Sequence, residues 1–495
     1  MKDTLFLMCD QLNPKVLDRC MELGLAPNLQ SLRRRSANFT AAYCTTPLCT
    51  PSRGSIVTGL YPHQNGLVFN IMRRDYPCVG GPETEQGIEN RDCTTEKLLW
   101  QAGWNTGHVG KWHLLGEDLA YYPQMYREHY EYAREMEETF RQVTATRSRE
   151  DYMDWYGWKL PVEPTERFRA AAARIGEPWR SAPNLHDFYA KIGPMALKTE
   201  DTFDYRVASR AIRFLENLDD RPFFLTCSFN APHDPNVISR EYYDRVKDLD
   251  FQPEADAFCE EYFQHDLSYE VAQQGGADFI REFKRVYYAS VCYIDDQVGR
   301  VLEALEKSGR QANIVFLADH GDMVGGHGMF WKCSMNFYDE IARVPFLLCA
   351  PELPAGDYDF PVELTDLMPT LLTLSGVAVP SHLEGEDLLP YCLGQKSAEG
   401  RTAFSERLDC NAEHTRVQQT YDHFAFMLRT KRYKYELFQK DGRMTQFLYD
   451  LQADPRENHD LSAAQPEIAE QMRRKLLERL TDTHCDCIFA WDTLR

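Results

Sequence analysis

The hydrophobic residues of this chain fall into short runs that end abruptly at polar residues. The clearest runs are residues 5–8, 223–229 and 314–318. They are followed by Asp10, His233 and Asp319. A short, uninterrupted apolar run is typical of a strand with both faces buried in a parallel sheet. The pattern therefore predicts three central strands, each with a polar side chain just beyond its end.

Between these runs, hydrophobic positions recur at helical spacing. Residues 204–218 and 288–305 are the two clearest amphipathic stretches. Strands that alternate with helices favour a doubly wound α/β fold with a mostly parallel sheet. Ligands of such folds bind beyond the carboxyl ends of the strands. We therefore expect the polar residues at the strand ends to form one site.

The pattern changes after about residue 380. Short alternating segments at 424–428, 433–437 and 446–450 precede a polar helical stretch at 465–480. This order predicts a small antiparallel sheet with a terminal helix. We expect a catalytic domain over residues 1–380 and a C-terminal subdomain over 381–495. Residues 118–200 and 250–282 show no strand rhythm, and we interpret them as insertions around the mouth of the site, helical in part.

Composition narrows the possible functions. The chain has 495 residues, of which 43% are hydrophobic and 26% charged, with a formal net charge of -21. This charge argues against nucleic acid or an anionic membrane as a partner, so any anionic substrate needs a local positive cluster. The apolar start is too short for a signal peptide, and no run approaches the length of a membrane span. With fifteen cysteines in no metal-binding spacing, we expect a cytoplasmic protein with free thiols.

The segment at residues 47–59 is the first candidate for chemistry. Pro51 suits the first turn of a helix, and Cys49 or Thr50 suits its N-cap, which places Cys49 among free backbone amides. Such a helix start attracts anions. Arg53 follows Cys49 by one helical turn and can reach the same place. The alternative is a buried cysteine that caps a structural helix.

This segment resembles the signature of type I sulfatases, in which the cysteine is oxidised to formylglycine. The matching residues are Cys49, Pro51, Ser52, Arg53, Thr58 and Gly59. Further fragments at 110–113, 231–235, 318–322, 338–340 and 448–451 follow the family's order and approximate spacing. The resemblance thus spans nearly the whole chain. It implies an alkaline-phosphatase-like α/β/α sandwich with a large mixed, mostly parallel sheet, plus a smaller C-terminal α+β unit with an antiparallel sheet.

The resemblance also implies one divalent cation. Its ligands would be Asp10, Gln11, an oxygen of the converted Cys49, Asp319 and His320. Oxygen-rich ligation favours Ca²⁺, with Mg²⁺ as an alternative, and the nitrogen of His320 admits Mn²⁺. The family often has Asp and Asn where this chain has Gln11 and His320, so the site would be less negative. Taken singly, an aspartate at a strand end more often caps the next helix.

The remaining site residues take their roles from the resemblance. Hydrated formylglycine would attack sulfur, and its second hydroxyl would allow the covalently bound sulfate to be expelled. Arg53 and Lys111 would hold this residue and neutralise sulfate oxygens. His113 is our candidate base for the expulsion, and His233 or Lys332 would protonate the leaving oxygen. Asn70 is a further candidate for substrate contact.

Several alternatives stay open at this stage. Phosphonate monoester or phosphodiester hydrolases share the formylglycine and the metal, and a non-catalytic binding protein would keep Cys49 unmodified. Residues 10–13, 26–28 and 47–49 are similar to choline sulfatase, whereas residues 111–113 and 62–66 are closer to arylsulfatase-like and sugar-sulfate enzymes, including N-sulfoglucosamine hydrolases. We expect a sulfated saccharide or another small sulfate ester as the substrate, and a formylglycine-generating maturase as a transient partner.

Overall fold

The computed structural model of the protein describes most of the chain. The described ranges are residues 2–70, 88, 93–114, 124–155, 158–175, 191–252, 261–264, 266–332, 335–409, 423–440 and 442–483. Within these ranges no helix is both long and apolar enough to cross a bilayer.

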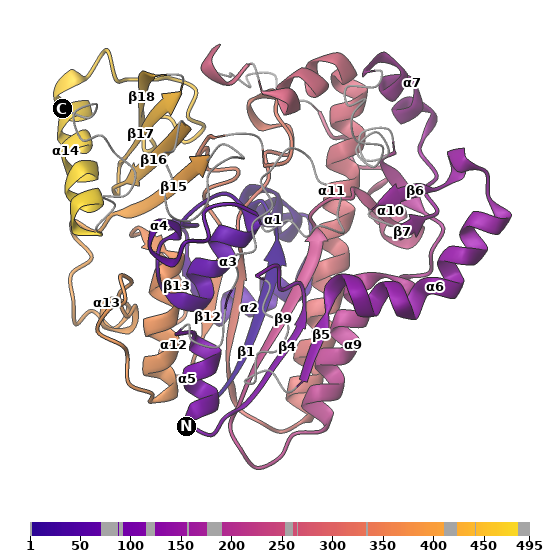
Figure 1. The fold of residues 1–495 in the computed structure, drawn as a ribbon, viewed down its shortest axis with the longest axis horizontal. Helices are drawn as coiled ribbons and strands as arrows, with labels where there is room; N and C mark the ends of the chain where they lie inside the picture. Colours follow the sequence, from indigo (N-terminus) through magenta and orange to yellow (C-terminus); the bar gives the residue numbers. More distant parts are fainter. Residues whose placement is uncertain are drawn as a thin grey trace.

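A central sheet of eight strands organises the larger part of the protein (Figure 1). Its order is β13 (Gly356–Tyr358), β2 (Ala37–Phe39), β12 (Phe346–Cys349), β11 (Ala312–Ala318), β1 (Asp3–Asp10), β9 (Phe223–Pro232), β4 (Asn105–Gly110) and β5 (Gln124–Arg127). Among these described strands, only β12 runs against the others. The three strands predicted from apolar runs are β1, β9 and β11, and they lie side by side.

Helices cover both faces of this sheet, as expected for an α/β/α sandwich (Figure 1). One layer contains α1 (Pro14–Glu22), α2 (Pro27–Arg34), α9 (Phe203–Glu216) and the long α11 (Leu267–Lys307), which contacts the other three. The opposite layer contains α3 (Cys49–Thr58), α5 (Thr95–Gln101) and α12 (Leu367–Ser375), which contact one another. The mostly parallel α/β fold predicted from the sequence is therefore confirmed.

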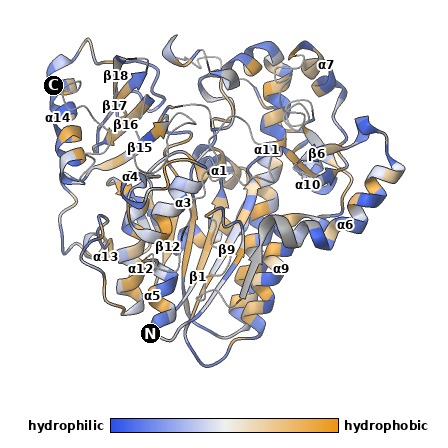
Figure 2. Cartoon of the chain, viewed as in Figure 1, coloured by the Kyte–Doolittle hydropathy of each residue, from blue (hydrophilic) through white to orange (hydrophobic). Residues whose placement is uncertain are grey.

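The hydropathy of the elements explains this layering. Every residue of β1 is buried, and the central strands are coloured mainly hydrophobic in Figure 2. The flanking helices alternate between hydrophobic and hydrophilic residues in the same view. In α9 the buried side chains include Phe203, Val207, Ala211 and Phe214, which recur at three- or four-residue spacing on one face.

The two predicted insertions contain more regular structure than expected. Residues 118–200 include strand β5, which extends the central sheet beside β4, together with α6 (Glu128–Thr146), α7 (Glu166–Ile175) and the short strands β6 (Met153–Trp155), β7 (Trp158–Leu160) and β8 (Gly193–Met195). The second segment, 250–282, includes the first part of α11, whose helical geometry breaks at Gly276 (φ 68°). Sequence periodicity missed both features because β5 is only four residues long and Gly276 interrupts the helical pattern.

A second, antiparallel sheet forms the C-terminal part. Its order is β15 (Ala403–Asp409), β16 (His423–Arg429), β17 (Tyr433–Lys440) and β18 (Arg443–Asp450), and α14 (Pro466–Asp482) follows it. Along β16, Phe424, Phe426 and Leu428 belong to the cluster that includes α14, whereas Ala425 and Met427 pack in a cluster with residues 335–342 of the larger part. This alternation confirms the predicted sheet and terminal helix. The boundary near residue 380 stays a prediction.

A buried lysine joins the two parts. Lys434 of β17 donates to Asp339 Oδ1 at 2.7 Å and to the carbonyl of Phe337 at 2.8 Å, and it also contacts Glu457. Burial would raise the pKa of Asp339, but Lys434 holds it well below its usual range. The ammonium is therefore the main counter-charge of two buried carboxylates.

Replacing Lys434 by methionine is expected to lower the free energy of unfolding by about 3–5 kcal/mol, because the change keeps the aliphatic stem but removes the main counter-charge of the buried carboxylates. Lys431 provides the matched control: its pair with Asp359 is 70% exposed on both sides, so Lys431→Met should cost less than about 0.5 kcal/mol. Urea denaturation of both variants measures the difference, and equal costs would contradict the buried pairing.

Candidate active site

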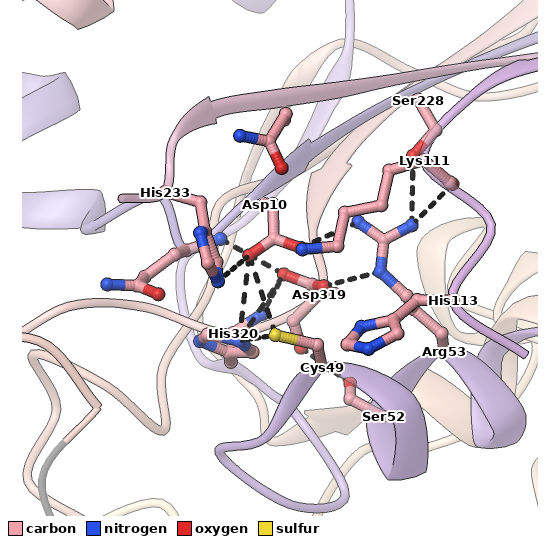
Figure 3. A network of polar contacts seen from close by, with 12 residues as sticks. Asp10, Cys49, Ser52, Arg53, Lys111, His113, Ser228, His233, Asp319 and His320 are labelled. Carbon is pink, nitrogen blue, oxygen red and sulfur yellow. Dashed lines mark hydrogen bonds and ion pairs between the residues drawn. The ribbon is translucent and has the colours of Figure 1, made fainter. Parts of the chain in front are cut away.

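Four neighbouring strands deliver polar side chains to one end of the central sheet. The strands are adjacent in the order β11, β1, β9 and β4, and they run parallel. At their carboxyl ends lie Asp319 and His320 (β11), Asp10 and Gln11 (β1), His233 (β9), and Lys111 and His113 (β4). Figure 3 shows the labelled side chains among these turning toward a common centre. The expectation that strand-end residues gather at one site is therefore met by the geometry.

Helix α3 brings Cys49 to the same place. The helix begins at Cys49, and Leu48 is its N-cap, one residue earlier than the cap predicted from the sequence. Leu48 has no side-chain oxygen to cap the helix, and the backbone N–H of Thr50 instead donates to Asn70 Oδ1 at 3.0 Å. Asn70 thus supports the start of the helix, and its predicted contact with substrate stays a prediction.

The side chains of Asp10, Cys49, Asp319 and His320 form a buried donor cluster. One ligand atom from each lies within 4.8 Å of the others, and all four residues are fully buried. Cys49 Sγ lies 3.2 Å from His320 Nε2 and 3.7 Å from Asp10 Oδ1. His320 Nδ1 donates to the carbonyl of Gly321, which turns Nε2 toward the cluster. This donor set fits a divalent cation.

Electrostatics at the cluster agree with this assignment. Burial opposes the charge on His320, yet Asp319 and Cys49 raise its pKa to about 9. Burial and the neighbouring Asp10 raise the pKa of Asp319. The cluster therefore attracts positive charge, which a divalent cation would supply in place of protons.

Gln11 adds a fifth possible ligand. Its side-chain Nε2 donates to Asp322 Oδ2 at 2.5 Å, which fixes the orientation of the amide. Its Oε1 is buried and has no hydrogen-bond partner in the part of the chain that the structure describes. An orphaned, buried amide oxygen on the residue that follows Asp10 is the kind of ligand that Ca²⁺ accepts.

Arg53 and Lys111 bind the two carboxylates. Arg53 donates through Nε to Asp319 Oδ2 at 2.7 Å and through Nη2 to Asp10 Oδ2 at 3.0 Å. Lys111 Nζ lies 2.8 Å from Asp10 Oδ2. Burial would raise the pKa of Asp10, but Lys111 and Arg53 hold it well below its usual range. The sequence had placed both cations against residue 49, whereas their ion pairs in the structure are with these aspartates.

Three residues support the site in ways that the sequence did not predict. Ser228 Oγ accepts from Arg53 Nη1 at 2.9 Å, and Ser52 Oγ donates to the carbonyl of Asp319 at 2.5 Å. Asp322 accepts from Gln11 and from the backbone of Val324 and Trp331. Ser228 alternates with apolar residues near the end of β9, which is a weak signal, and Asp322 lies in the 318–322 fragment that matches the family, close to Asp319 in the chain.

Lys332 and His233 approach Cys49 from the other side. Lys332 Nζ lies 3.4 Å from Cys49 Sγ and 2.6 Å from His233 Nε2. His233 Nδ1 donates to the carbonyl of Asp234 at 2.6 Å, so Nε2 accepts the proton of the lysine. His113 completes the group with a hydrogen bond to Cys49. All eight of the residues predicted to share one cavity (10, 49, 111, 113, 233, 319, 320 and 332) are thus gathered around the same point.

The position of Cys49 Sγ strongly favours a negative charge. Burial alone would raise the pKa of this thiol, but Lys332, Lys111 and His320 lower it well below its ordinary value, with help from His113. An anion placed here is stabilised by converging positive groups rather than by water. The site is therefore built to hold a negatively charged reacting group beside a cation.

Comparison with known proteins agrees with this geometry. The profile of the sulfatase family ("Sulfatase") matches residues 11–377. A second profile, "N-sulphoglucosamine sulphohydrolase, C-terminal", matches residues 325–485. Together they span the residues of the site other than Asp10, and the antiparallel sheet.

Individual relatives differ in what they act on. The chain is 27% identical to the choline-sulfatase of Rhizobium meliloti, over 92% of this chain and 82% of that protein. It is also 27% identical to an N-acetylglucosamine-6-O-sulfatase of Bacteroides thetaiotaomicron, over 92% and 81%. The fold is similar to that of the phosphonate monoester hydrolase of Silicibacter pomeroyi, with a TM-score of 0.74 and 19% identity over 98% of this chain and 96% of that one.

Calcium is expected to raise the thermal unfolding midpoint of the chelator-treated protein, because ligand binding to the folded state adds about 2.7 kcal/mol at one hundred times Kd. Asp319→Asn should abolish this increment, and Gln11→Met should reduce it, since four donors remain. Asp219→Asn, at a fully exposed carboxylate, is the matched control and should keep it. Scanning calorimetry with and without Ca²⁺ measures the shift. A full calcium increment in the Asp319 variant would rule out this cluster as the cation site.

Proposed function

Since the chain belongs to the sulfatase family, we propose that it releases inorganic sulfate from a sulfated saccharide or another small sulfate ester, with a formylglycine made from Cys49 as its nucleophile. The family and its relatives support a hydrolase that acts on sulfate esters. The observation that carries the proposal is the convergence of Lys332, His113 and the donor cluster on Cys49.

Cys49 is suitably placed for such a residue. It lies at the first position of α3, between the donor cluster and Lys332. Formylglycine at this position supplies a hydrated aldehyde with two hydroxyl groups, one to attack sulfur and one whose deprotonation frees the sulfate afterwards. A serine would offer a single hydroxyl and would remain blocked as a sulfate ester.

Separate residues would hold the divalent cation and balance the charge of its carboxylate ligands. Asp10, Gln11, Asp319 and His320 would hold the divalent cation, which supplies positive charge beside the hydroxyl and the sulfate. Arg53 and Lys111 neutralise Asp10 and Asp319, so they keep the carboxylates ionised and in place. Ca²⁺ is our proposed ion, because the donors are predominantly oxygen.

Proton transfer falls to three residues beside Cys49. Lys332 donates to His233 Nε2, and this pair is our proposed source of the proton for the leaving oxygen. Burial would lower the pKa of Lys332, but Cys49, Asp234 and Asp10 raise it, so the ammonium stays charged and attracts sulfate oxygens. His113, which hydrogen bonds to residue 49, is our proposed base for sulfate release.

The substrate is proposed to be a saccharide sulfate or sulfamate. The profile over residues 325–485 is named for an N-sulphoglucosamine sulphohydrolase, and one relative is an N-acetylglucosamine-6-O-sulfatase. Choline sulfate is the second candidate because of the relative in Rhizobium meliloti. A phosphonate monoester is the third, because of the similar fold and because Gln11 follows the first aspartate. A cytoplasmic location stays a prediction from the sequence.

Cys49→Ala is expected to lower sulfate release by about 10³-fold or more, because the nucleophile is lost. Cys93→Ala, at a half-buried cysteine outside the site, is the matched control and should keep the activity. Mass spectrometry of protein from the native host should find the peptide with position 49 lighter than its cysteine form. Unmodified cysteine in protein that still releases sulfate would disprove the formylglycine proposal.

Substrate preference is expected to follow the order glucosamine sulfates, aryl sulfate, choline sulfate and aryl phosphonate when kcat/KM is compared. The O- and N-sulfated forms of glucosamine separate sulfatase from sulfamidase action within the same experiment. Faster turnover of the phosphonate than of every sulfate would replace our proposal with the phosphonate hydrolase alternative. Faster turnover of choline sulfate would keep the sulfatase activity and change the substrate.

A further inference from the structure

A second cavity, of about 590 Å³, lies beside the α1 and α11 layer. Its walls come from the start of α1, the middle of α11, the loop at 323–327 and the turn at 455–458. The charged and aromatic residues that line it include Lys15, Arg19, Lys284, Tyr288, Glu340 and Arg456. None of the eight residues gathered around Cys49 lines it.

The lining is strongly positive for a chain with a net charge of -21. Four side chains of lysine and arginine face one carboxylate, that of Glu340, which pairs with Lys15 at 2.6 Å. Arg19 forms only a solvent-exposed pair with Glu22, which contributes little. Positive charge concentrated in a cavity of an acidic protein attracts an anionic ligand.

Glycines in the 323–328 loop leave room for this cavity. Gly325 has φ 86°, and a Cβ there would lie 3.2 Å from Cε of Lys284. A Cβ at Gly326 would lie 2.9 Å from Cγ of Glu340. Any larger residue at these positions would therefore press against the side chains that line the cavity. On α1, Lys15 and Arg19 are one turn apart and share a face of the helix.

The lining matches a sugar that bears anionic groups. A volume of this size is within the usual range for small-molecule sites. Besides the cations, the wall offers the ring of Tyr288 and the amide of Asn458, which suit the apolar face and the hydroxyl groups of a sugar. We propose that this cavity binds a sulfated sugar unit at a position separate from the catalytic residues. The choice of a sulfated sugar rests on the proposed function, whereas the affinity for an anion does not.

One loop connects the lining of the cavity with the catalytic site. Met323, which lines it, donates its backbone N–H to the carbonyl of Trp331 at 3.1 Å, and Lys332 follows directly. Asp322 fixes the same loop through the backbone of Val324 and Trp331 while it holds Gln11. A sugar bound in the cavity therefore rests against the loop that presents Lys332 to Cys49.

The test is isothermal titration of glucosamine 2-N,6-O-disulfate into protein in the Cys49→Ala background, which prevents turnover. We expect Arg19→Ala/Arg456→Ala to weaken binding in the cavity at least tenfold, because both arginines are exposed and both line it. Arg213→Ala/Arg474→Ala removes the same charge from exposed positions on α9 and α14 and should leave binding unchanged. Binding at the catalytic cluster is common to both double variants and cancels from the comparison.

Two results would overturn the proposal. Equal binding by the two double variants would show that the arginines of the cavity do not hold the sugar. Inorganic sulfate that binds as tightly as the sugar disulfate, or N-acetylglucosamine that does so, would exclude a sulfated sugar as the specific ligand. This experiment measures binding and not turnover. A negative result would therefore reject the sugar site without deciding whether the unsubstituted protein releases sulfate.

Discussion

The site depends on one buried arrangement of charge, in which the guanidinium of Arg53 lies between the carboxylates of Asp10 and Asp319. Two carboxylates at the ends of adjacent strands repel each other strongly when water is excluded, and neither could stay ionised without a shared cation. Arg53 provides that cation from α3, and Ser228 and the carbonyl of Lys111 fix its remaining N–H groups. The same contacts anchor the first turn of α3, so the position of Cys49 follows from how the aspartates are neutralised.

This arrangement separates two kinds of positive charge. Arg53 is bound to both aspartates and serves the cation site, and Lys111 pairs with Asp10 while its charge also acts on residue 49. Lys332 is directed at residue 49 by its contact with His233. A reacting sulfate therefore meets positive groups whose charge the aspartates already balance. It also meets Lys332, which is directed at residue 49 instead. The distinction gives each cation a different effect when it is removed: loss of the first kind disturbs the carboxylates, and loss of the second disturbs the anion.

The sequence was sufficient for the parts of this picture that depend on local pattern. Apolar runs located β1, β9 and β11, and their ends located Asp10, His233 and Asp319, because buried parallel strands need continuous hydrophobic residues. The partners of Arg53 and Gln11 could not be read in this way, since Asp319 and Asp322 are more than 260 residues distant in the chain. The family resemblance supplied the site residues, but it did not predict the ion pairs of Arg53 with the aspartates. The N-cap of α3 is Leu48, one residue before Cys49, because Asn70, which lies outside residues 47–59, accepts from the backbone N–H of Thr50.

The two-sided burial of the C-terminal sheet affects how the protein can be made. Residues 335–342 contribute Phe337, Tyr338 and Ile341 to a hydrophobic cluster that also contains Phe438, Phe447 and Tyr449. In the same segment, Asp339 pairs with Lys434 of β17. During synthesis on the ribosome these groups emerge about a hundred residues before the strands that cover them. The nascent chain therefore holds an uncovered apolar surface, and a carboxylate without its lysine partner, until these strands emerge.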